Sequence, residues 1–425
     1  MKKTDEKYEK CLNVLKEELL PAMGCTEPIA IAYCAAVARV TLGDIPDRVA
    51  VKASGNIIKN VKSVVVPNTG NLKGITAAVA AGVIAGNANK KLEVISSVTK
   101  EQIGAIKKYL SCAEIAVELA ASPYIFDINI TVYKNDSYAT VRIVNYHTNI
   151  VLIEKDGEIL QDCVISCETE NGLTNRSFLS VELILDFANS VEIADVKDLL
   201  DIQTKYNMAI AEEGLKNSYG ANIGSVLLNH NEVSMKLRAK ALAAAGSDAR
   251  MNGCDMPVII NSGSGNQGIT ACVPVVVFAR ELKISDEKRY RALVLSNLIA
   301  IHQKTRIGRL SAYCGAINAG AAAGCGIAYL LDGSLDAISH TLVNALAIAS
   351  GVICDGAKAS CAGKIAVAVD TGILGYEMYC DNQQFFGGDG IVKESTENTL
   401  VSVGRLGHDG MKETDIEILN IMIDK

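Results

Sequence analysis

The most apolar stretch of the chain, Ala316 to Leu331, limits its fold more than any other feature. It holds about 16 residues, mostly Ala and Gly, with the polar Asn318 inside it, whereas a helix that spans a bilayer needs about 20 residues and larger apolar side chains. We therefore expect a buried helix rather than a membrane span, and no membrane partner. Because Ala and Gly let helix backbones approach closely, the stretch indicates a tightly packed helical layer.

Segments with a helical pattern recur towards both ends of the chain. An amphipathic pattern over Asp5–Leu20 and an Ala-rich run over Ile29–Val40 each predict a helix. The later segments with such a pattern are Val191–Met208, Ser225–Ala245, Asp286–Gln303, Ser311–Leu331 and Asp336–Val352. Since the first and the later helices are alike in composition, we expect one helical domain built from residues 1–45 and 190–425.

The middle of the chain has a different pattern. Apolar and polar residues alternate over Phe126–Tyr133, which is typical of a half-buried strand, and the turn clusters Lys134–Ser137 and Asp156-Gly157 predict a meander around it. Together with a strand expected at Arg48–Ser54 and a helix expected over Thr99–Leu119, these segments predict a small antiparallel sheet with a helix beside it.

The expected fold class is therefore α+β. The mainly helical domain carries an inserted, smaller α+β domain, residues 46–189, which contributes substrate-binding loops. A short strand at Ser63–Val66 and a helix at Gly74–Gly86 are expected within this smaller domain.

Charge and cysteine usage exclude several classes of protein. The chain has 425 residues with 41 basic and 48 acidic side chains, a net charge of −7, and without a basic tract it is not expected to bind nucleic acid. It has 13 cysteines, and its charged amino-terminal segment is unlike an export signal. Reduced thiols and a cytoplasmic location are therefore expected. The oligomeric state stays open, and a homo-oligomer is compatible with the sequence.

Several familiar cofactor signatures are missing or incomplete in the sequence. Gly263–Gly268 has the glycine spacing of a dinucleotide loop, but no strand of a βαβ unit is expected before it. The five histidines are scattered beyond chelating spacing, which argues against a histidine zinc site. No lysine carries a local signature of a pyridoxal-phosphate Schiff base.

One near-repeat has two interpretations. Gly70–Ala77 resembles Gly265–Ala271 with one residue deleted, and each copy ends a polar loop and opens an apolar helix. The two copies are either recurring helix caps or a pair of loops whose backbone N–H groups converge on an anionic ligand.

The cysteines fall into groups by their neighbourhood. Those in apolar or strand-like runs are expected to be core residues: Cys11, Cys34, Cys112, Cys163 and Cys272. Those in glycine-rich or kinked segments are suited to chemistry: Cys25, Cys314, Cys354 and Cys361. Cys25 should precede a helix amino terminus, where the dipole favours a thiolate. Cys163 and Cys167, four residues apart in a segment expected to be exposed, are not expected to bind a metal.

A set of motifs in a fixed order covers nearly the whole chain, from about Leu12 to the tail Gly404–Met411. The motifs are Met23-Gly24-Cys25-Thr26-Glu27-Pro28, Ser54-Gly55-Asn56, Pro67-Asn68-Thr69-Gly70, Ile307-Gly308-Arg309-Leu310-Ser311-Ala312-Tyr313-Cys314-Gly315 and Cys354-Asp355-Gly356-Ala357-Lys358. They resemble the L-cysteine desulfidase family, which is related to the alpha chain of iron–sulfur L-serine dehydratase. The tail differs somewhat from the family pattern.

The resemblance implies a lyase that needs no pyridoxal phosphate and converts L-cysteine to hydrogen sulfide, ammonia and pyruvate with an oxygen-sensitive [4Fe–4S] cluster. The family's ligands carry over to Cys25, Cys314 and Cys354, and Cys361 is left outside this set. Three thiolates leave one iron without a protein cysteine, which is the open position that a Lewis-acid cluster needs. The expected partner is a small amino acid, L-cysteine.

The catalytic base and the substrate contacts are assigned on chemical grounds. The first choice of base for the α-proton is Lys304, since a lysine desolvated beside a cluster can be neutral near pH 7. Lys358 and then His302 are alternatives, and a competing interpretation makes Lys304 a solvated or carboxylate-binding residue. The polar loops are expected to bind the substrate through Ser54, Asn56, Asn68, Thr69, Gly70, Ser262, Ser264 and Asn266.

Other functions stay open at this point. An L-serine dehydratase would keep the cluster and eliminate hydroxide instead of hydrosulfide. A cluster-bearing redox sensor is the alternative that is not an enzyme, although the net negative charge and the lack of a DNA-binding signature in the sequence disfavour it. A protein without a cluster, whose cysteines are all core residues, is the remaining interpretation.

Overall fold

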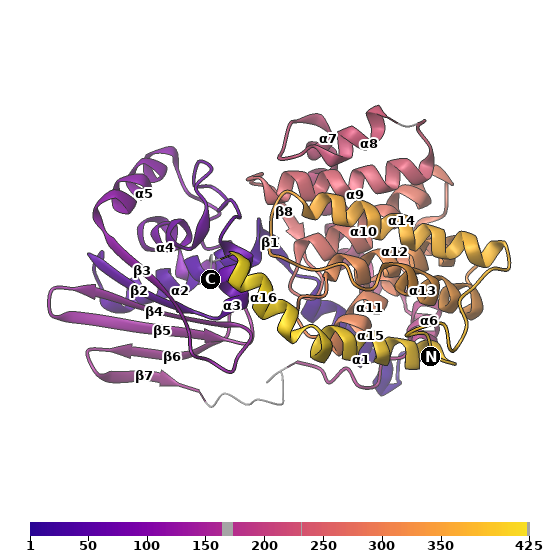
Figure 1. The fold of residues 1–425 in the computed structure, drawn as a ribbon, viewed down its shortest axis with the longest axis horizontal. Coiled ribbons are helices and arrows are strands. Elements are labelled where there is room, and N and C mark those ends of the chain that lie inside the picture. Colours follow the sequence, from indigo (N-terminus) through magenta and orange to yellow (C-terminus); the bar gives the residue numbers. More distant parts are fainter. Residues whose placement is uncertain (164–172, 231, 423–425) are drawn as a thin grey trace.

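The computed structural model describes residues 1–163, 173–230 and 232–422. It has a helical body and a smaller body built on a sheet, and the two lie side by side (Figure 1). The predicted α+β fold is confirmed. None of the described helices is both long enough and apolar enough to cross a membrane.

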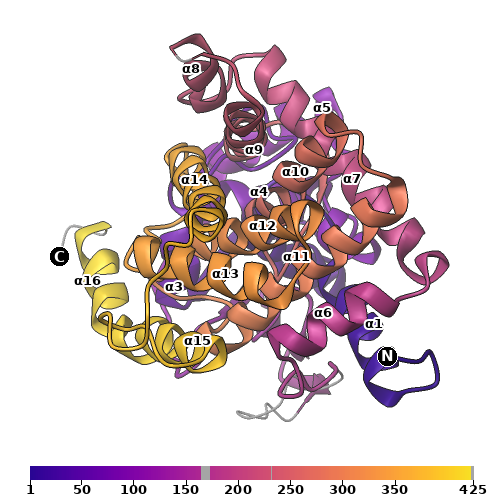
Figure 2. The same cartoon turned by 90° about the vertical axis from the view of Figure 1, so that its right-hand side faces the viewer.

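The apolar stretch forms α12 (Gly315–Leu331), which lies at the centre of the helical body (Figure 2). Its glycines let α14 (Cys361–Cys380) pack directly against it, because a Cβ on Gly320 would lie 2.3 Å from the carbonyl oxygen of Ala368. The other helices of this body are α1 (Glu6–Glu18), α6 (Val181–Ser190), α7 (Ile193–Lys216), α8 (Ile223–Asn229), α9 (Met235–Met251), α10 (Gly265–Glu281), α11 (Asp286–Ile307), α13 (Leu335–Ala349) and α15 (Thr396–Arg405), followed by the π-helical turn η2 (Leu406–Gly410).

The sheet of the smaller body has the order β3-β2-β4-β5-β6-β7, in which β2 and β3 are parallel and the other neighbours antiparallel. Its strands are β2 (Arg48–Ala53), β3 (Glu114–Leu119), β4 (Asp127–Lys134), β5 (Ser137–Val144), β6 (Ile150–Lys155) and β7 (Glu158–Asp162). The helical segments of this body are α2 (Thr26–Leu42), α3 (Gly55–Val61), α4 (Gly74–Ala85), the 3-10 turn η1 (Ala88–Glu93) and α5 (Lys100–Cys112). Ser63–Val66, expected as a strand, forms only an isolated bridge from Val65 to Lys73.

Two predicted helices are wrong in extent. The helix expected over Thr99–Leu119 ends at Cys112, because the alternating residues Glu114–Leu119 pair with β2 as an edge strand. The helix expected over Ser225–Ala245 is divided into α8 and α9, and α9 has its own amino-terminal cap, the hydroxyl of Ser234. Both errors come from tertiary pairing or capping that overrides a helical pattern.

Each body has its own large hydrophobic core. The buried side chains of α1 belong to the core of the helical body, whereas those of α2 belong to the core around the sheet. The division into residues 1–45 with 190–425 and residues 46–189 stays a prediction, and this packing favours a boundary before α2. The short strands β1 (Pro21–Met23) and β8 (Pro257–Ile259) pair where the bodies meet, and α16 (Lys412–Met422) returns from the helical body to α3 (Figure 1).

Candidate active site

A cavity lies between the two bodies, next to the ends of β1 and β8. It encloses about 910 Å³ of atom-free space, its open mouth included. The amino ends of α2, α10, α12 and α14 supply lining residues: Cys25, Ser264, Cys314 and Cys361. Since a helix amino terminus carries partial positive charge and free N–H groups, this arrangement favours an anionic ligand in the cavity.

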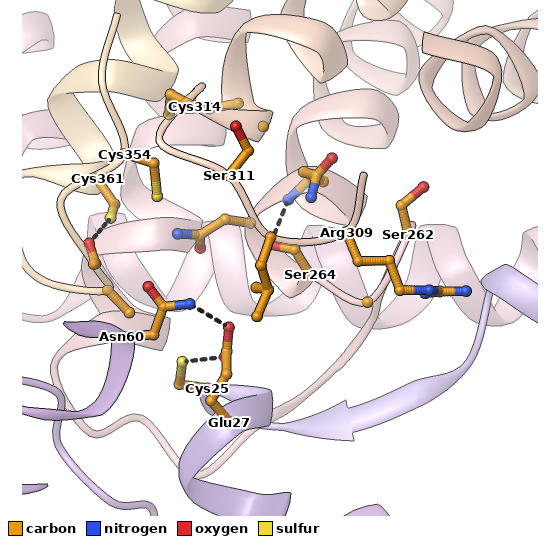
Figure 3. Close-up of a pocket in the computed structure, with 18 of the residues that line it drawn as sticks. Cys25, Glu27, Asn60, Ser262, Ser264, Arg309, Ser311, Cys314, Cys354 and Cys361 are labelled. Carbon is orange, nitrogen blue, oxygen red and sulfur yellow. Dashed lines mark hydrogen bonds between the residues drawn. The ribbon is translucent and has the colours of Figure 1, made fainter. Parts of the chain in front are cut away.

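Cys314, Cys354 and Cys361 gather on one side of this cavity (Figure 3). The loops before α12 and α14 are bonded to each other, because the Cys314 N–H donates to the Val352 carbonyl at 3.0 Å and the Cys354 N–H donates to the Ala312 carbonyl at 2.6 Å. Burial raises the pKa of the Cys314 thiol, and the neighbouring Cys354 and Cys361 thiols raise it further. These thiols therefore share one electrostatic environment.

Cys25 lies apart from the other cavity cysteines (Figure 3). Its thiol donates to Oε2 of Glu27 at 3.1 Å, and the charges that act on it are those of Glu27 and Arg250. Burial raises the pKa of Cys25 well above its ordinary value, and the Glu27 carboxylate raises it further. Desolvation and the neighbouring Glu27 carboxylate therefore oppose the thiolate that the position of Cys25 before α2 was expected to favour.

The donor set suits an iron–sulfur cluster better than a single ion. Thiolates are the ligands of such clusters, and each cysteine binds a different iron atom, so the ligands stand further apart than around one ion. In the part of the chain that the structure describes, no three His, Cys, Asp or Glu side chains are placed to hold a single metal ion. Cys112 and Cys163, expected in the core, are both exposed, because Cys112 ends α5 and Cys163 directly follows the edge strand β7. Cys167 lies outside the described residues.

Lys304 is the lysine that lines this cavity. It lies in the last turn of α11, 5% exposed, and burial lowers its pKa to about 8, although the Cys354 and Cys314 thiols pull the pKa upward. Lys358 does not line the cavity, and its Nζ is paired with the Asp355 carboxylate at 2.5 Å. His302 contacts the Glu397 carboxylate at 2.9 Å, away from the cavity.

The expected substrate contacts are divided between different places. Ser262, Ser264 and Asn266 line the cavity, the two serines from the loop between β8 and α10 and Asn266 from the first turn of α10. A buried amide network holds this loop, since Asn261 Nδ2 donates to Oδ1 of Asn297 at 3.0 Å. Ser262 adopts a positive φ of 51°, and its hydroxyl donates to Asn261 Oδ1 at 2.9 Å.

The remaining expected contacts lie elsewhere. Ser54 and Asn56 line a second cavity, of about 1090 Å³, next to α16. The Asn68 side chain donates to the Ile95 carbonyl at 3.0 Å, and Thr69 is fully buried with its hydroxyl on the Val66 carbonyl. Neither these two residues nor Gly70 lines either cavity. The two copies of the near-repeat therefore do not converge, which favours the helix-cap interpretation for the first copy.

The cavity also holds polar residues that the sequence analysis missed. Several residues of its lining have a buried polar atom without a hydrogen-bond partner in the part of the chain that the structure describes: Asn60 Oδ1, His147 Nε2, Arg250 Nε, Asn266 Oδ1 and Gln267 Oε1. Buried polar groups are nearly always paired, so this concentration points to a polar ligand. Asn60, His147 and Arg250 are isolated in sequence and carry no local signal, whereas Glu27 belongs to a motif already identified.

Electrostatics fixes the charge of two of these groups. Burial lowers the pKa of His147 to about 4, so the imidazole is neutral at physiological pH. Burial by itself raises the pKa of Glu27, but the nearby His147 and the hydrogen bond from Cys25 more than offset it, and the net shift is downward. Asn60 Nδ2 also donates to Oε1 of Glu27 at 3.0 Å. The cavity thus combines a buried carboxylate with a buried lysine.

Comparison with known proteins places this chain in a family. The family described as serine dehydratase alpha chain matches residues 89–420, more than half of the chain. A UPF0597 protein of Desulfitobacterium hafniense is 60% identical, over 100% of this chain and 99% of the relative. A UPF0597 protein of Lachnoclostridium phytofermentans is 50% identical, over 98% of this chain and 100% of the relative. A UPF0597 protein of Treponema denticola is 48% identical, over 98% of this chain and 98% of the relative. The chain therefore belongs to the serine dehydratase alpha chain family of iron–sulfur, pyridoxal-phosphate-independent lyases, which confirms the resemblance of its motifs.

Proposed function

We propose that this protein cleaves L-cysteine to hydrogen sulfide, ammonia and pyruvate by β-elimination in the cavity between the two bodies. The observation that carries the proposal is the meeting of grouped thiols, a buried lysine and unpartnered polar atoms in one cavity. The family supports the lyase chemistry, and the motifs that resemble L-cysteine desulfidases support the choice of substrate.

The ligands proposed for a [4Fe–4S] cluster are Cys314, Cys354 and Cys361. This set replaces Cys25 with Cys361, because the Cys361 thiol shares the electrostatic environment of the other two, whereas Cys25 is bonded to Glu27. The number of protein ligands stays at three, so one iron would be free of protein cysteine. When bound, such a cluster supplies a Lewis acid next to the substrate.

Lys304 is the proposed base. A pKa of about 8 leaves part of the lysine neutral near pH 7, and in that form Nζ can accept the α-proton of the substrate. Loss of this proton together with hydrosulfide from Cβ leaves 2-aminoacrylate, and hydrolysis converts that to pyruvate and ammonium. Ser262, on the loop before α10, and Asn266, in the first turn of α10, are proposed to hold the substrate by hydrogen bonds.

An L-serine dehydratase is the competing function, because the same residues could abstract the α-proton of serine. The test is anaerobic purification with reconstitution of the cluster, followed by assays for bound iron and sulfide. We expect sulfide release from L-cysteine with a kcat/KM well above that for pyruvate formation from L-serine. The reverse preference would assign the dehydratase reaction, and a protein that binds iron but turns over neither amino acid would refute the proposed function.

A further inference from the structure

We infer that Arg250 is the anchor for the α-carboxylate of a free amino acid bound in this cavity. The inference deepens the proposed function and rests on it only for the class of ligand. It starts from a buried guanidinium that, among the described residues, has no carboxylate within ion-pair distance.

Arg250 lies in the last turn of α9 and is 3% exposed. It lines the cavity, and its Nε has no hydrogen-bond partner within residues 1–163, 173–230 and 232–422. Among the described residues, no carboxylate lies within ion-pair distance of its guanidinium group, whereas Arg309 on the same cavity is paired with Glu18 at 2.7 Å. Since an unpaired buried charge is strongly unfavourable, the site is complete only when an anion joins it.

The position of Arg250 strengthens the case for an anion. Its guanidinium lies against the first residue of α10, since a Cβ on Gly265 would be 2.3 Å from the Arg250 Nε. The amino terminus of α10 therefore adds its partial positive charge and its N–H groups at the same place. A guanidinium binds a carboxylate through two parallel hydrogen bonds, which fixes the orientation of the ligand.

The other unpartnered atoms indicate that the ligand also carries hydrogen-bond donors. Asn60, Asn266 and Gln267 line the cavity, and each has a buried amide oxygen without a hydrogen-bond partner among the described residues. An ammonium group has three donors and no acceptor, so such oxygens suit it. A guanidinium for a carboxylate and amide oxygens for an ammonium together fit the zwitterion of an amino acid.

Neutralising the cysteine thiolates is the rival role for Arg250. The charges near Cys314 and Cys361 include Lys364, whereas Arg250 acts on Cys25 and Glu27. Arg250 is therefore associated electrostatically with Cys25 and Glu27 rather than with the proposed ligands. This placement favours the substrate over the cluster as the anion that Arg250 binds.

The test compares Arg250→Met and Arg250→Lys with the wild type and with Arg280→Met, a control on the exposed part of α10. Calorimetry on the anaerobically purified protein would measure binding of L-cysteine, L-serine, cysteamine, which lacks the carboxylate, and 3-mercaptopropionate, which lacks the amino group. We expect Arg250→Met to weaken binding of the ligands with a carboxylate by roughly 10- to 100-fold and to leave cysteamine unchanged. Arg250→Lys should be intermediate, and Arg280→Met should match the wild type.

Three results would overturn the inference. They are equal affinity in all variants, an equal loss for cysteamine, and a loss of iron from both Arg250 variants with unchanged ligand binding. Either of the first two results would show that Arg250 does not bind the carboxylate of the ligand. The third would show that its guanidinium neutralises the cysteine thiolates instead. If the wild type releases neither sulfide nor pyruvate but binds amino acids in an Arg250-dependent way, the inference stands and the proposed reaction falls.

Discussion

At the residue level, burial separates two lysines that the sequence offers as alternatives. Lys304 is carried into the cavity wall by the last turn of α11, and among the described residues its side-chain Nζ makes no hydrogen bond or ion pair. Lys358 is fixed by Asp355, whose pKa is lowered to about 2 mainly by hydrogen bonds from Lys358 and Lys364 that outweigh its burial. A lysine that holds a structural carboxylate is poorly suited to accept a proton from a substrate.

The first prediction concerns Lys304. Lys304→Ala should keep its iron and bind L-cysteine, but kcat should fall by about 10²–10⁴ because the proton acceptor is gone. Exchange of the α-hydrogen with deuterated water, if the wild type shows it, should stop in the variant. Lys358→Ala is the control and should stay within a few-fold of the wild type. A Lys304→Ala enzyme that changes mainly in KM would instead make Lys304 a binding residue.

The second prediction separates the two sets of cluster ligands. Single replacement of Cys314, Cys354 or Cys361 by Ala should abolish iron retention, because each removes a thiolate ligand. Cys25→Ala should retain iron, as should Cys112→Ala, which changes an exposed cysteine. Iron and sulfide assays on anaerobically reconstituted protein give the answer. Iron loss in Cys25→Ala with full iron in Cys361→Ala would restore the set expected from the sequence.

The sequence indicated part of this site and missed the rest for a physical reason. Cys314 and Cys354 belong to local motifs, and the glycine-rich context of each is visible in the chain itself. Arg250 comes from the last turn of a helix and His147 from the loop between β5 and β6, and nothing in their neighbouring residues indicates a cavity. Only the packing of α9 against α10 brings a lone arginine to the site.

At the level of elements, the hydrophobic patterns predicted whether most segments are helices or strands. They did not predict the residues at which tertiary contacts make these elements end. The alternation over Phe126–Tyr133 corresponds to β4, and the Ala-rich run after Cys25 corresponds to α2. α3 was not expected, because Gly55–Val61 is short and its first turn packs against Leu419 from the far end of the chain. Such long-range contacts have no local trace in the sequence.

The third prediction concerns Asp248, whose side chain connects α9 to α8. This residue of α9 is fully buried, its Oδ2 accepts the Gly224 N–H at 3.0 Å, and its Oδ1 has no partner. Burial raises the pKa of Asp248 to about 6, above the ordinary value of 3.8. The folded protein therefore keeps a proton that the unfolded chain releases between these pH values, and folding stability falls as the pH rises through this window.

Asp248→Asn removes this titration while it keeps an oxygen for Gly224. The difference in free energy of unfolding between the variant and the wild type should move in favour of the variant as the pH rises from about 4.5 to about 7.5. Urea unfolding at the two pH values measures this difference. If the difference in free energy of unfolding between variant and wild type is the same at both pH values, Asp248 has the same pKa in the folded and unfolded states.

At the level of the whole molecule, the cavity depends on how the two bodies are held together. The β1–β8 pair joins them beside the cavity, and α16 crosses from η2 to α3 on another side (Figure 1). Lys59 of α3, with a side chain 2% exposed, forms an ion pair with Asp415 of α16, and Asn56 Nδ2 donates to Asp415 at 2.6 Å. Asn56, expected at the substrate, thus belongs to the contact between the bodies.

The last prediction tests this contact with Asp415→Asn. The substitution leaves the Lys59 ammonium buried without a counter-charge, and breaking a buried pair costs about 3–5 kcal/mol. We expect the lower end of this range, since 18% of the Asp415 side chain is exposed. KM for L-cysteine should rise as well, because residues from both bodies line the cavity.

The matched control for Asp415→Asn is Asp409→Asn. This substitution breaks the ion pair between Asp409 and Lys412, which are 3.1 Å apart and have side chains that are 59% and 61% exposed, respectively. An exposed pair contributes less than about 1 kcal/mol, so this variant should unfold close to the wild type and keep its KM. Denaturant unfolding and steady-state kinetics on both variants make the comparison. If the two substitutions lower stability equally, the Lys59–Asp415 pair does not hold the bodies together. If Asp415→Asn loses stability at unchanged KM, α16 stabilises the fold without shaping the cavity.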